Sequence, residues 1–342
     1  MEKGIHTRSE ILTQPVAWEQ ALNVIERARQ QLKPLLGADY EQILFTGCGS
    51  TYYLSLSAAA LIQDLTGRIA RAVPGGELLL NPVVTLGHGS TLLVAVSRSG
   101  STTETIRAVE QFKQHKRGPV IAITNYGDQP LASLADVPLV IEKGQEESVA
   151  QTRSFASMFV GATALAAMAS GDKGLSKKMA RLPEVGRKLL DTYEPVARKF
   201  GENLAFDRFY FLGSGSRYGL ACEANLKMKE MTLTHSEPFH FLEFRHGPMS
   251  MVKESAVVVG LLSDKNYDHE SAVLYEMQAK GGAILSIAES RAVVAFESGI
   301  LESLRGALYL PVLQLMAFYR SLAKGLDPDR PTNLTAVVKL DL

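Results

Sequence analysis

Residues 45–54 read FTGCGSTYYL and residues 211–220 read FLGSGSRYGL, so one glycine-rich stretch occurs twice at an offset of 166. Phe, both Gly, Ser, Tyr and Leu recur in the same order. Matching elements at a long, fixed period indicate an internal duplication. Further matches follow along the chain: Leu92–Ser97 with Val258–Ser263, Glu104 with Glu270, and, after a small shift, Val120–Ile123 with Ala283–Ile287.

Short apolar runs bounded by Gly, Ser or Asn alternate with helical patterns in the first half. Such runs are typical of strands that are buried on both faces of a sheet. The predicted strands are Ile43–Thr46, Leu92–Val96, Val120–Thr124 and Pro138–Ile141, with helices at Leu54–Leu65 and Thr103–Lys113 between them. Strand–helix alternation implies a parallel sheet with right-handed crossovers. The sequence therefore predicts an α/β fold with two doubly wound parallel-sheet domains related by duplication.

The remaining segments flank these domains. We expect an N-terminal helical segment over residues 1–40 (helix Pro15–Leu35), a first domain over 41–172, a second over 195–324 and a tail over 325–342. Ser154–Gly171 carries no charge, but its Ala, Ser and Gly content favours a helix buried in a protein core over a membrane span. A charged, helix-prone stretch, Lys173–Arg198, connects the two domains.

Composition excludes several classes of protein. The chain has 342 residues, 36 Lys and Arg against 36 Asp and Glu, and therefore no basic surplus for nucleic acid or an anionic membrane. No apolar signal segment is visible at the N-terminus, so we expect a cytoplasmic protein. Cys48 and Cys222 lie far apart outside any Cys/His cluster, which favours two buried, reduced thiols over a zinc site.

Two loops after predicted strands carry the clearest candidate site. Gly47–Thr51 follows the first strand, and Ser97–Thr103, with its hydroxyls, Arg98 and Gly100, precedes a helix. Ligands of such folds bind beyond the carboxyl ends of strands, and helix N-termini favour anions. The alternative is ordinary helix capping by Ser101 or Thr103 together with Glu104. Neither a Walker motif nor a complete G-x-G-x-x-G is present, and the second copy, residues 263–268, has carboxylates that repel phosphate.

A second candidate site lies on the helix after the repeated turn. Glu223, Lys227 and Glu230 are spaced to share one helical face. Spacing alone also fits a solvated salt-bridge face, whereas a carboxylate beside a lysine suits proton transfer next to a sugar carbonyl. His246 follows in an R-H-G-P turn. The spacing of His235, His240 and His246 matches no usual metal-ligand pattern, so no metal is expected.

Together these motifs resemble the sugar isomerase (SIS) family, in particular the isomerase part of glucosamine-6-phosphate synthase and related sugar-phosphate deaminases. The resemblance implies two flavodoxin-like SIS domains, a homodimer with shared active sites, and no cofactor. It implies a proton-transferring Glu230, a neighbouring Lys227 with Glu223 on the same helix, His246 for ring opening, and Val149 in a sugar-contacting loop, residues 147–152. The motifs that match the family are residues 48–52, 97–102, 223–230 and 245–248 and the tail Asp327-x-Asp329-x-Pro331-x-Asn333-Leu334. The phosphate ligands that the resemblance implies are Ser50, Thr51, Ser97, Arg98, Ser99 and Thr102.

Two departures from the family pattern shape the predicted reaction. The sequence shows no glutamine-hydrolysing domain, so no internal ammonia source is expected, and Ala336 occupies the position of the synthase's tail lysine. Lys339 is nearby but out of register. We therefore expect an enzyme that deaminates an amino-sugar 6-phosphate, giving a ketose 6-phosphate and ammonia. A fructosamine-type 6-phosphate deglycase, a phosphosugar aldose–ketose isomerase and a non-catalytic sugar-phosphate-binding regulator stay open as alternatives.

Overall fold

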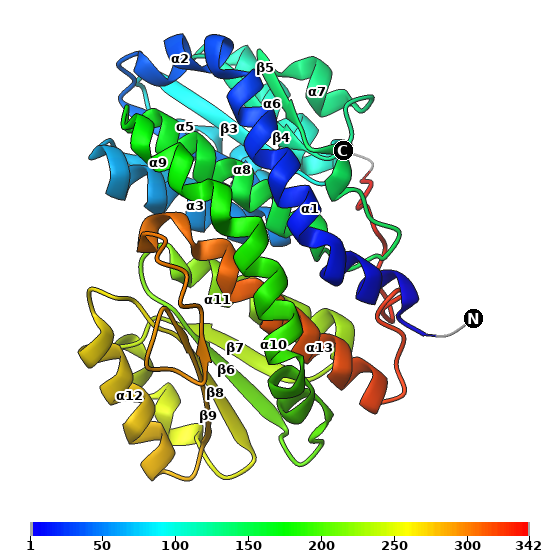
Figure 1. The fold of residues 1–342 in the computed structure, drawn as a ribbon. Coiled ribbons are helices and arrows are strands. Elements are labelled where there is room, and N and C mark those ends of the chain that lie inside the picture. The colour runs from blue at the N-terminus through cyan, green and yellow to red at the C-terminus, as the bar shows by residue number, and fades with distance from the viewer. Residues whose placement is uncertain (1–2, 341–342) are drawn as a thin grey trace. The chain divides into compact units, whose positions relative to one another are not determined.

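The computed structural model describes residues 3–340, which form two compact units (Figure 1). Of the described residues, the first-sheet unit comprises 13–146, 153–180 and 335–340. The second-sheet unit comprises 3–12, 147–152 and 181–334. Each unit is built around one parallel sheet of five strands.

The first sheet has the strand order β2-β1-β3-β4-β5, with every neighbouring pair parallel. Its strands are β1 (Gln42–Gly47), β2 (Ala70–Pro74), β3 (Thr91–Ser97), β4 (Val120–Thr124) and β5 (Val137–Val140). The central strands β3 and β4 are buried at every residue, which is why they appear in the sequence as unbroken apolar runs. The four predicted strands are confirmed, and β2 is an additional one.

Helices cover both faces of the first sheet. On one face α3 packs against α8, while on the other α4, α6 and α7 enclose a core that includes Leu93, Val109 and Phe112. The helices of this part of the chain are α1 (Ile5–Arg27), α2 (Arg29–Gly37), α3 (Ser50–Thr66), α4 (Gly75–Leu80), α5 (Pro82–Leu86), α6 (Thr103–Gln114), α7 (Pro130–Leu134), η1 (Glu142–Gly144), α8 (Arg153–Ala169) and α9 (Lys173–Lys178).

The second sheet repeats the first. Its order is β7-β6-β8-β9-β10, again all parallel, so both sheets have the 2-1-3-4-5 order of flavodoxin-like folds. The strands are β6 (Arg208–Leu212), β7 (His235–Phe239), β8 (Ala256–Leu261), β9 (Ala283–Ala288) and β10 (Val294–Ala295). The helices are η2 (Met179–Arg181), α10 (Leu182–Glu202), α11 (Arg217–Thr232), η3 (Glu243–Arg245), η4 (Pro248–Met251), α12 (Tyr267–Ala279), η5 (Glu302–Leu304), η6 (Gly306–Tyr309) and α13 (Leu310–Ala323). The predicted fold class and duplication are confirmed.

Two sequence-based expectations need correction. The N-terminal helix does not run from Pro15 to Leu35: α1 begins at Ile5, includes Pro15, and is followed by a separate helix α2. The early start is stabilised by Asp329, whose carboxylate accepts hydrogen bonds from the backbone N–H groups of His6 (3.1 Å) and Thr7 (2.7 Å). Such a cap comes from the other end of the chain and leaves no local signal.

The other correction concerns the thiols. Both cysteines are free, but only Cys222 is buried, and Cys48 is half-buried. Burial raises the pKa of the Cys222 thiol to about 11 and also raises that of Cys48, where a hydrogen bond with Thr105 opposes the effect. The uncharged stretch forms α8, most of which is buried, as predicted. Among residues 3–340 no helix has the length and apolar character needed to cross a membrane.

Candidate functional site

The two glycine-rich loops of the first-sheet unit meet at one edge of the sheet. They follow β1 and β3, which are parallel neighbours with Thr46 opposite Ala95. The helix after β1, α3, packs against α8, and the helix after β3, α6, packs against α4 and α7. The chain thus leaves these two strands in opposite directions, which opens the crevice where ligands of such folds bind.

Glycine gives the first loop its shape in both copies. Gly49 and its counterpart Gly215 have φ angles of +57° and +58°, a conformation that side chains with a Cβ rarely adopt. A Cβ on Gly47 would lie 2.7 Å from the backbone carbon of Thr51, and one on Gly213 would lie 2.4 Å from the backbone oxygen of Arg217. The repeated sequence therefore encodes a repeated tight turn onto a helix.

Hydroxyls hold the anion loop, by which we mean residues 97–103, in its conformation. Ser97 Oγ accepts a hydrogen bond from Gly100 N (3.1 Å), and Ser99 Oγ accepts one from Ser101 N (3.2 Å). In the first loop, Thr51 Oγ1 accepts from Cys48 N (2.9 Å) and donates to Cys48 O (3.0 Å). The hydroxyls of Ser99 and Thr102 lie 3.4 Å apart. Ser50 and Thr51 are buried at the start of α3.

Ordinary capping does not account for this hydroxyl cluster. Thr102 is the N-cap residue of α6, but its side chain makes no capping hydrogen bond to the helix. Thr103, the first helical residue, instead accepts a hydrogen bond from Leu340 N through Oγ1 (3.1 Å). The cap position thus carries a hydroxyl that does not cap, and the N–H of Thr103 donates to Val338 O of the tail (3.4 Å), so the tail itself satisfies one donor of this helix N-terminus.

Arg98 lies in the anion loop, but its guanidinium is engaged within the protein. Its side chain is 8% exposed, Nη1 lies 3.7 Å from Oε2 of Glu146, and Nη2 donates to Ala336 O at 2.6 Å. The Glu146 side chain is fully buried and also accepts hydrogen bonds from the backbone and hydroxyl of Ser154, at the start of α8. Glu146 is a functional candidate that the sequence analysis missed, since only the fold brings it to Arg98.

The equivalent crevice in the second-sheet unit is filled by the protein's own side chains. Arg217, at the position of Thr51, donates to Glu270 (2.8 Å), to Glu302 and to Leu261 O (2.9 Å). Glu270 also accepts from Ser263 N at 2.7 Å, and Asp264 pairs with Arg305. Of the carboxylates in residues 263–268 that were expected to repel phosphate, Asp264 is paired with the internal guanidinium of Arg305.

The predicted triad on α11 is brought together and is mostly buried. Lys227 Nζ lies 3.4 Å from Oε1 of Glu223 and donates a hydrogen bond to Oε2 of Glu230. The side chains of Lys227, Glu223 and Glu230 are 3%, 1% and 22% exposed. The solvated salt-bridge interpretation is therefore wrong for Lys227 and Glu223. Only Glu230 combines the ion pair with access to solvent, which suits a group that exchanges protons with a ligand.

The other two predicted groups of this unit lie on loops. His246 is exposed, where it ends η3 and precedes Gly247. Val149 lies in the 147–152 loop, and its N–H donates to Asp329 O at 3.0 Å. A nearby ring, His240, stacks on Tyr218 with centroids 3.9 Å apart, and burial lowers its pKa.

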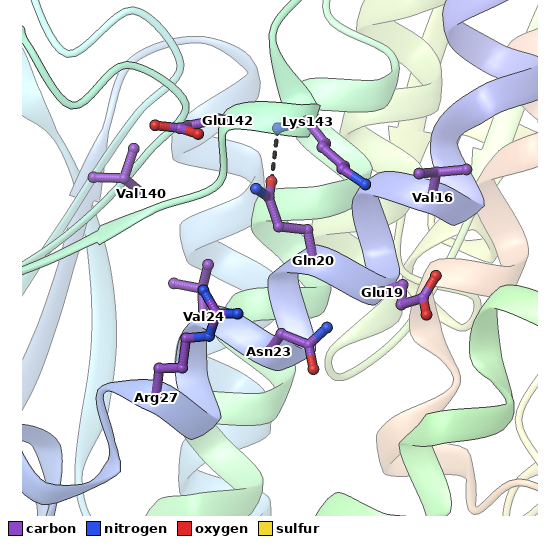
Figure 2. A pocket seen from close by; sticks show the side chains of 9 residues that line it. All are labelled: Val16, Glu19, Gln20, Asn23, Val24, Arg27, Val140, Glu142 and Lys143. Atoms are coloured by element: carbon purple, nitrogen blue, oxygen red, sulfur yellow. Dashed lines mark hydrogen bonds between the residues drawn. The ribbon is translucent and has the colours of Figure 1, made fainter.

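A polar cavity of about 470 Å³ in the first-sheet unit lies away from these residues (Figure 2). It is lined by α1, the end of β5 and η1, where Gln20 Oε1 accepts a hydrogen bond from Lys143 N at 2.6 Å. Its charged residues, among them Glu19, Arg27 and Glu142, are exposed. None of the predicted site residues lines it.

Two parallel 2-1-3-4-5 sheets, one with a hydroxyl-lined anion loop and the other with a buried carboxylate–lysine–carboxylate helix, define a duplicated α/β protein of the sugar-isomerase type. The family model described as "SIS domain" matches residues 38–168 and 206–295, and the chain belongs to this family.

Known relatives agree with this assignment. The glutamine–fructose-6-phosphate aminotransferase (isomerizing) of Clostridium tetani is 27% identical over 339 residues, covering 94% of this chain and 54% of that protein. The chain spans about half the length of the curated relatives it matches. A crystal structure of glucosamine-6-phosphate deaminase from Thermotoga maritima is 26% identical with a TM-score of 0.84, covering 98% of this chain and 100% of that one.

A third relative widens the range of reactions. The crystal structure of tagatose-6-phosphate ketose/aldose isomerase from Escherichia coli is 25% identical with a TM-score of 0.87, covering 96% of each chain. These relatives are enzymes, which confirms the prediction of an SIS-type enzyme.

Proposed function

We propose that the chain is an amino-sugar 6-phosphate deaminase/isomerase, which converts a 2-amino aldose 6-phosphate and water into a ketose 6-phosphate and ammonia. The observation that carries the proposal is the buried Lys227 between Glu223 and the partly exposed Glu230. The solved structure from Thermotoga maritima, which is named as a deaminase of this substrate class, supports it.

The phosphate would bind at the crevice of the first-sheet unit. Backbone N–H groups at the α6 N-terminus and small hydroxyl donors can satisfy the phosphate oxygens without a basic surface. This explains how a chain with no net charge can take an anionic substrate. The residues proposed to form this subsite are Ser50, Thr51, Ser97, Arg98, Ser99 and Thr102.

The proton chemistry would belong to the second-sheet unit. Glu230 removes the proton from C2 of the open-chain sugar and returns it to C1, while a second proton passes from the nitrogen to the oxygen on C1, which leaves an imine at C2. Water then adds to C2 and ammonia leaves, so atoms and charge balance without an added cofactor. Lys227 holds Glu230 in place and stabilises its charge, and His246 assists ring opening.

An ammonia assay tests the reaction directly. Incubation with glucosamine 6-phosphate should release ammonia and fructose 6-phosphate in equal amounts. Glu230→Gln should abolish turnover while leaving the thermal shift caused by the sugar phosphate in place. Glu202→Gln, which changes a surface ion pair on α10, is the matched control and should keep full activity. Absence of ammonia from any amino-sugar phosphate would sink the proposal.

A plain aldose–ketose isomerase is the second candidate, because of the ketose/aldose isomerase among the structural relatives. The same Glu230 could shuttle a proton on a substrate with a 2-hydroxyl group. Interconversion of hexose 6-phosphates without ammonia would favour this alternative, and turnover of a fructosamine-type 6-phosphate would favour a deglycase. Binding without any turnover would indicate a regulator.

We also propose a cytoplasmic homodimer in which His246 of one copy completes the site of the other. Subunit mixing tests this arrangement. Glu230→Gln and His246→Ala chains, each inactive alone, should regain about a quarter of wild-type activity when mixed, since random heterodimers would contain one intact site. Recovery of no activity in a confirmed heterodimer would refute shared sites.

A further inference from the structure

The 147–152 loop is held within the second-sheet unit at three points. At its start, the Glu10 carboxylate accepts hydrogen bonds from Glu147 N (2.6 Å), Ser148 N (3.2 Å) and the Ser148 hydroxyl. In its middle, Val149 N donates to Asp329 O, and at its end Gln314 Nε2 donates to Thr152 O (3.1 Å). The loop conformation therefore depends on side chains far away in the sequence.

Glu10 is a buried carboxylate on α1, only 3% exposed. A buried charge is stable only when hydrogen bonds replace its lost hydration, and here the loop backbone supplies them. The dependence is mutual, because these hydrogen bonds also stabilise one conformation of the loop. Glu10 thus ties the position of residues 147 and 148 to the first turns of α1.

Asp329 connects the same loop to the same helix. Its side chain accepts hydrogen bonds from His6 N, Thr7 N and the Thr7 hydroxyl (2.7 Å), so it caps α1. Its backbone oxygen accepts the hydrogen bond from Val149 N. Figure 1 shows the blue start of α1 beside the red tail that carries Asp329. One residue of the tail thereby holds both the helix and the loop.

We propose that Glu10 and Asp329 are positioning residues that set the place of Val149 and its neighbours against the sugar. This inference rests on the proposed function, in which the 147–152 loop contacts the sugar. Both carboxylates accept hydrogen bonds from backbone N–H groups of the protein, which is the contact through which they would act. Their effect on turnover passes through the loop.

Glu10→Gln tests the proposal with little change in volume. The amide removes the charge and turns an –NH₂ group toward N–H donors, so the loop loses at least one charge-assisted hydrogen bond. We expect the KM of the sugar phosphate to rise about tenfold and kcat to fall less than about threefold. The Ki of inorganic phosphate should change less than about twofold, since the anion loop belongs to the first-sheet unit.

Three further variants sharpen the result. Asp329→Asn should raise KM in the same way, and Glu10→Asp, which keeps the charge, should recover part of the loss. Glu19→Gln on the same helix is exposed and should behave as wild type. A merely structural role would lower thermal stability and move KM and the phosphate Ki together. An unchanged KM in Glu10→Gln would overturn the proposal.

Hydrogen exchange separates this inference from the proposed reaction. If wild type turns over no sugar phosphate, the reaction fails, but the amides of Glu147, Ser148 and Val149 can still be measured. In Glu10→Gln these amides should exchange at least about tenfold faster than in Glu19→Gln. Unchanged protection would show that Glu10 does not position the loop.

Discussion

The buried guanidinium of Arg217 in the second-sheet unit should contribute strongly to the stability of the folded chain. Arg217→Ala removes the cation that pairs with Glu270 at 2.8 Å, where the two side chains are 7% and 4% exposed. It also removes the donors to Glu302 and to Leu261 O. The carboxylate of Glu270 then stays buried without a cation.

Truncating one partner of a buried ion pair costs about 3–5 kcal/mol, because the remaining charge is uncompensated. With a urea m-value of about 2 kcal/mol/M, the unfolding midpoint should fall by about 2 M. Burial already raises the pKa of Glu270, with Arg217 opposing it, so removing the cation raises that pKa further. A carboxyl with a raised folded pKa binds its proton more tightly when folded, so stability falls as pH rises through that pKa. The loss should therefore be larger at pH 8 than at pH 5.

Urea unfolding followed by far-UV circular dichroism measures the loss. Arg208→Ala, which breaks a half-exposed pair with Asp207, is the control and should cost less than about 1 kcal/mol. The sugar-phosphate-induced thermal shift should persist in Arg217→Ala, because the anion loop lies in the other unit. A loss no larger than the control's, or one independent of pH, would refute the reasoning.

Three further predictions concern single positions. Glu146→Ala should destabilise the chain by about 2–4 kcal/mol in urea unfolding, since it removes the buried carboxylate beside the Arg98 guanidinium, whereas Glu110→Ala at a surface pair should cost less than about 1 kcal/mol. Between pH 9 and 11 the folded Cys222 thiol keeps its proton and the unfolded thiol does not, so this group should lower the free energy of unfolding by about 2 kcal/mol over that range, and Cys222→Ala should abolish this fall. Gly47→Ala should weaken sugar-phosphate binding at least about tenfold by calorimetry, because its Cβ meets backbone, while Gly76→Ala, with nothing near, should not.

The sequence predicted β1, β3, β4 and β5 of the first sheet and missed its other edge strand, β2. β3 and β4 are buried on both faces and leave continuous apolar runs. The edge strands β2 and β7 escaped prediction because each is only partly buried and carries polar residues and a proline. The edge strand β5 is also only partly buried and contains a proline, but its apolar run was still enough to predict it.

The candidate site also has parts that the sequence predicted and parts that only the fold reveals. The turns at Gly47 and Gly213 are local, so the repeated sequence was enough to predict them. The contact of Arg98 with Glu146 spans 48 residues and arises only when β5 places residue 146 at the carboxyl edge of the sheet. The burial of Lys227 was equally hidden, since i, i+4 spacing is the same for a solvated face and for a buried ion pair.

The two copies of the duplicated fold differ at one position in a way that bears on where a ligand could bind. Thr51 and Arg217 occupy equivalent places at the start of α3 and α11, after turns with the same left-handed glycine. The threonine bonds its own loop and leaves the crevice to donors, whereas the arginine extends into the crevice and pairs with Glu270. In the first copy the counterpart of Glu270 is Glu104, and the position of Arg217 is occupied by Thr51. The first copy therefore lacks the internal cation with which the second pairs its own carboxylate, and this difference supports the proposal that the phosphate binds in the first copy.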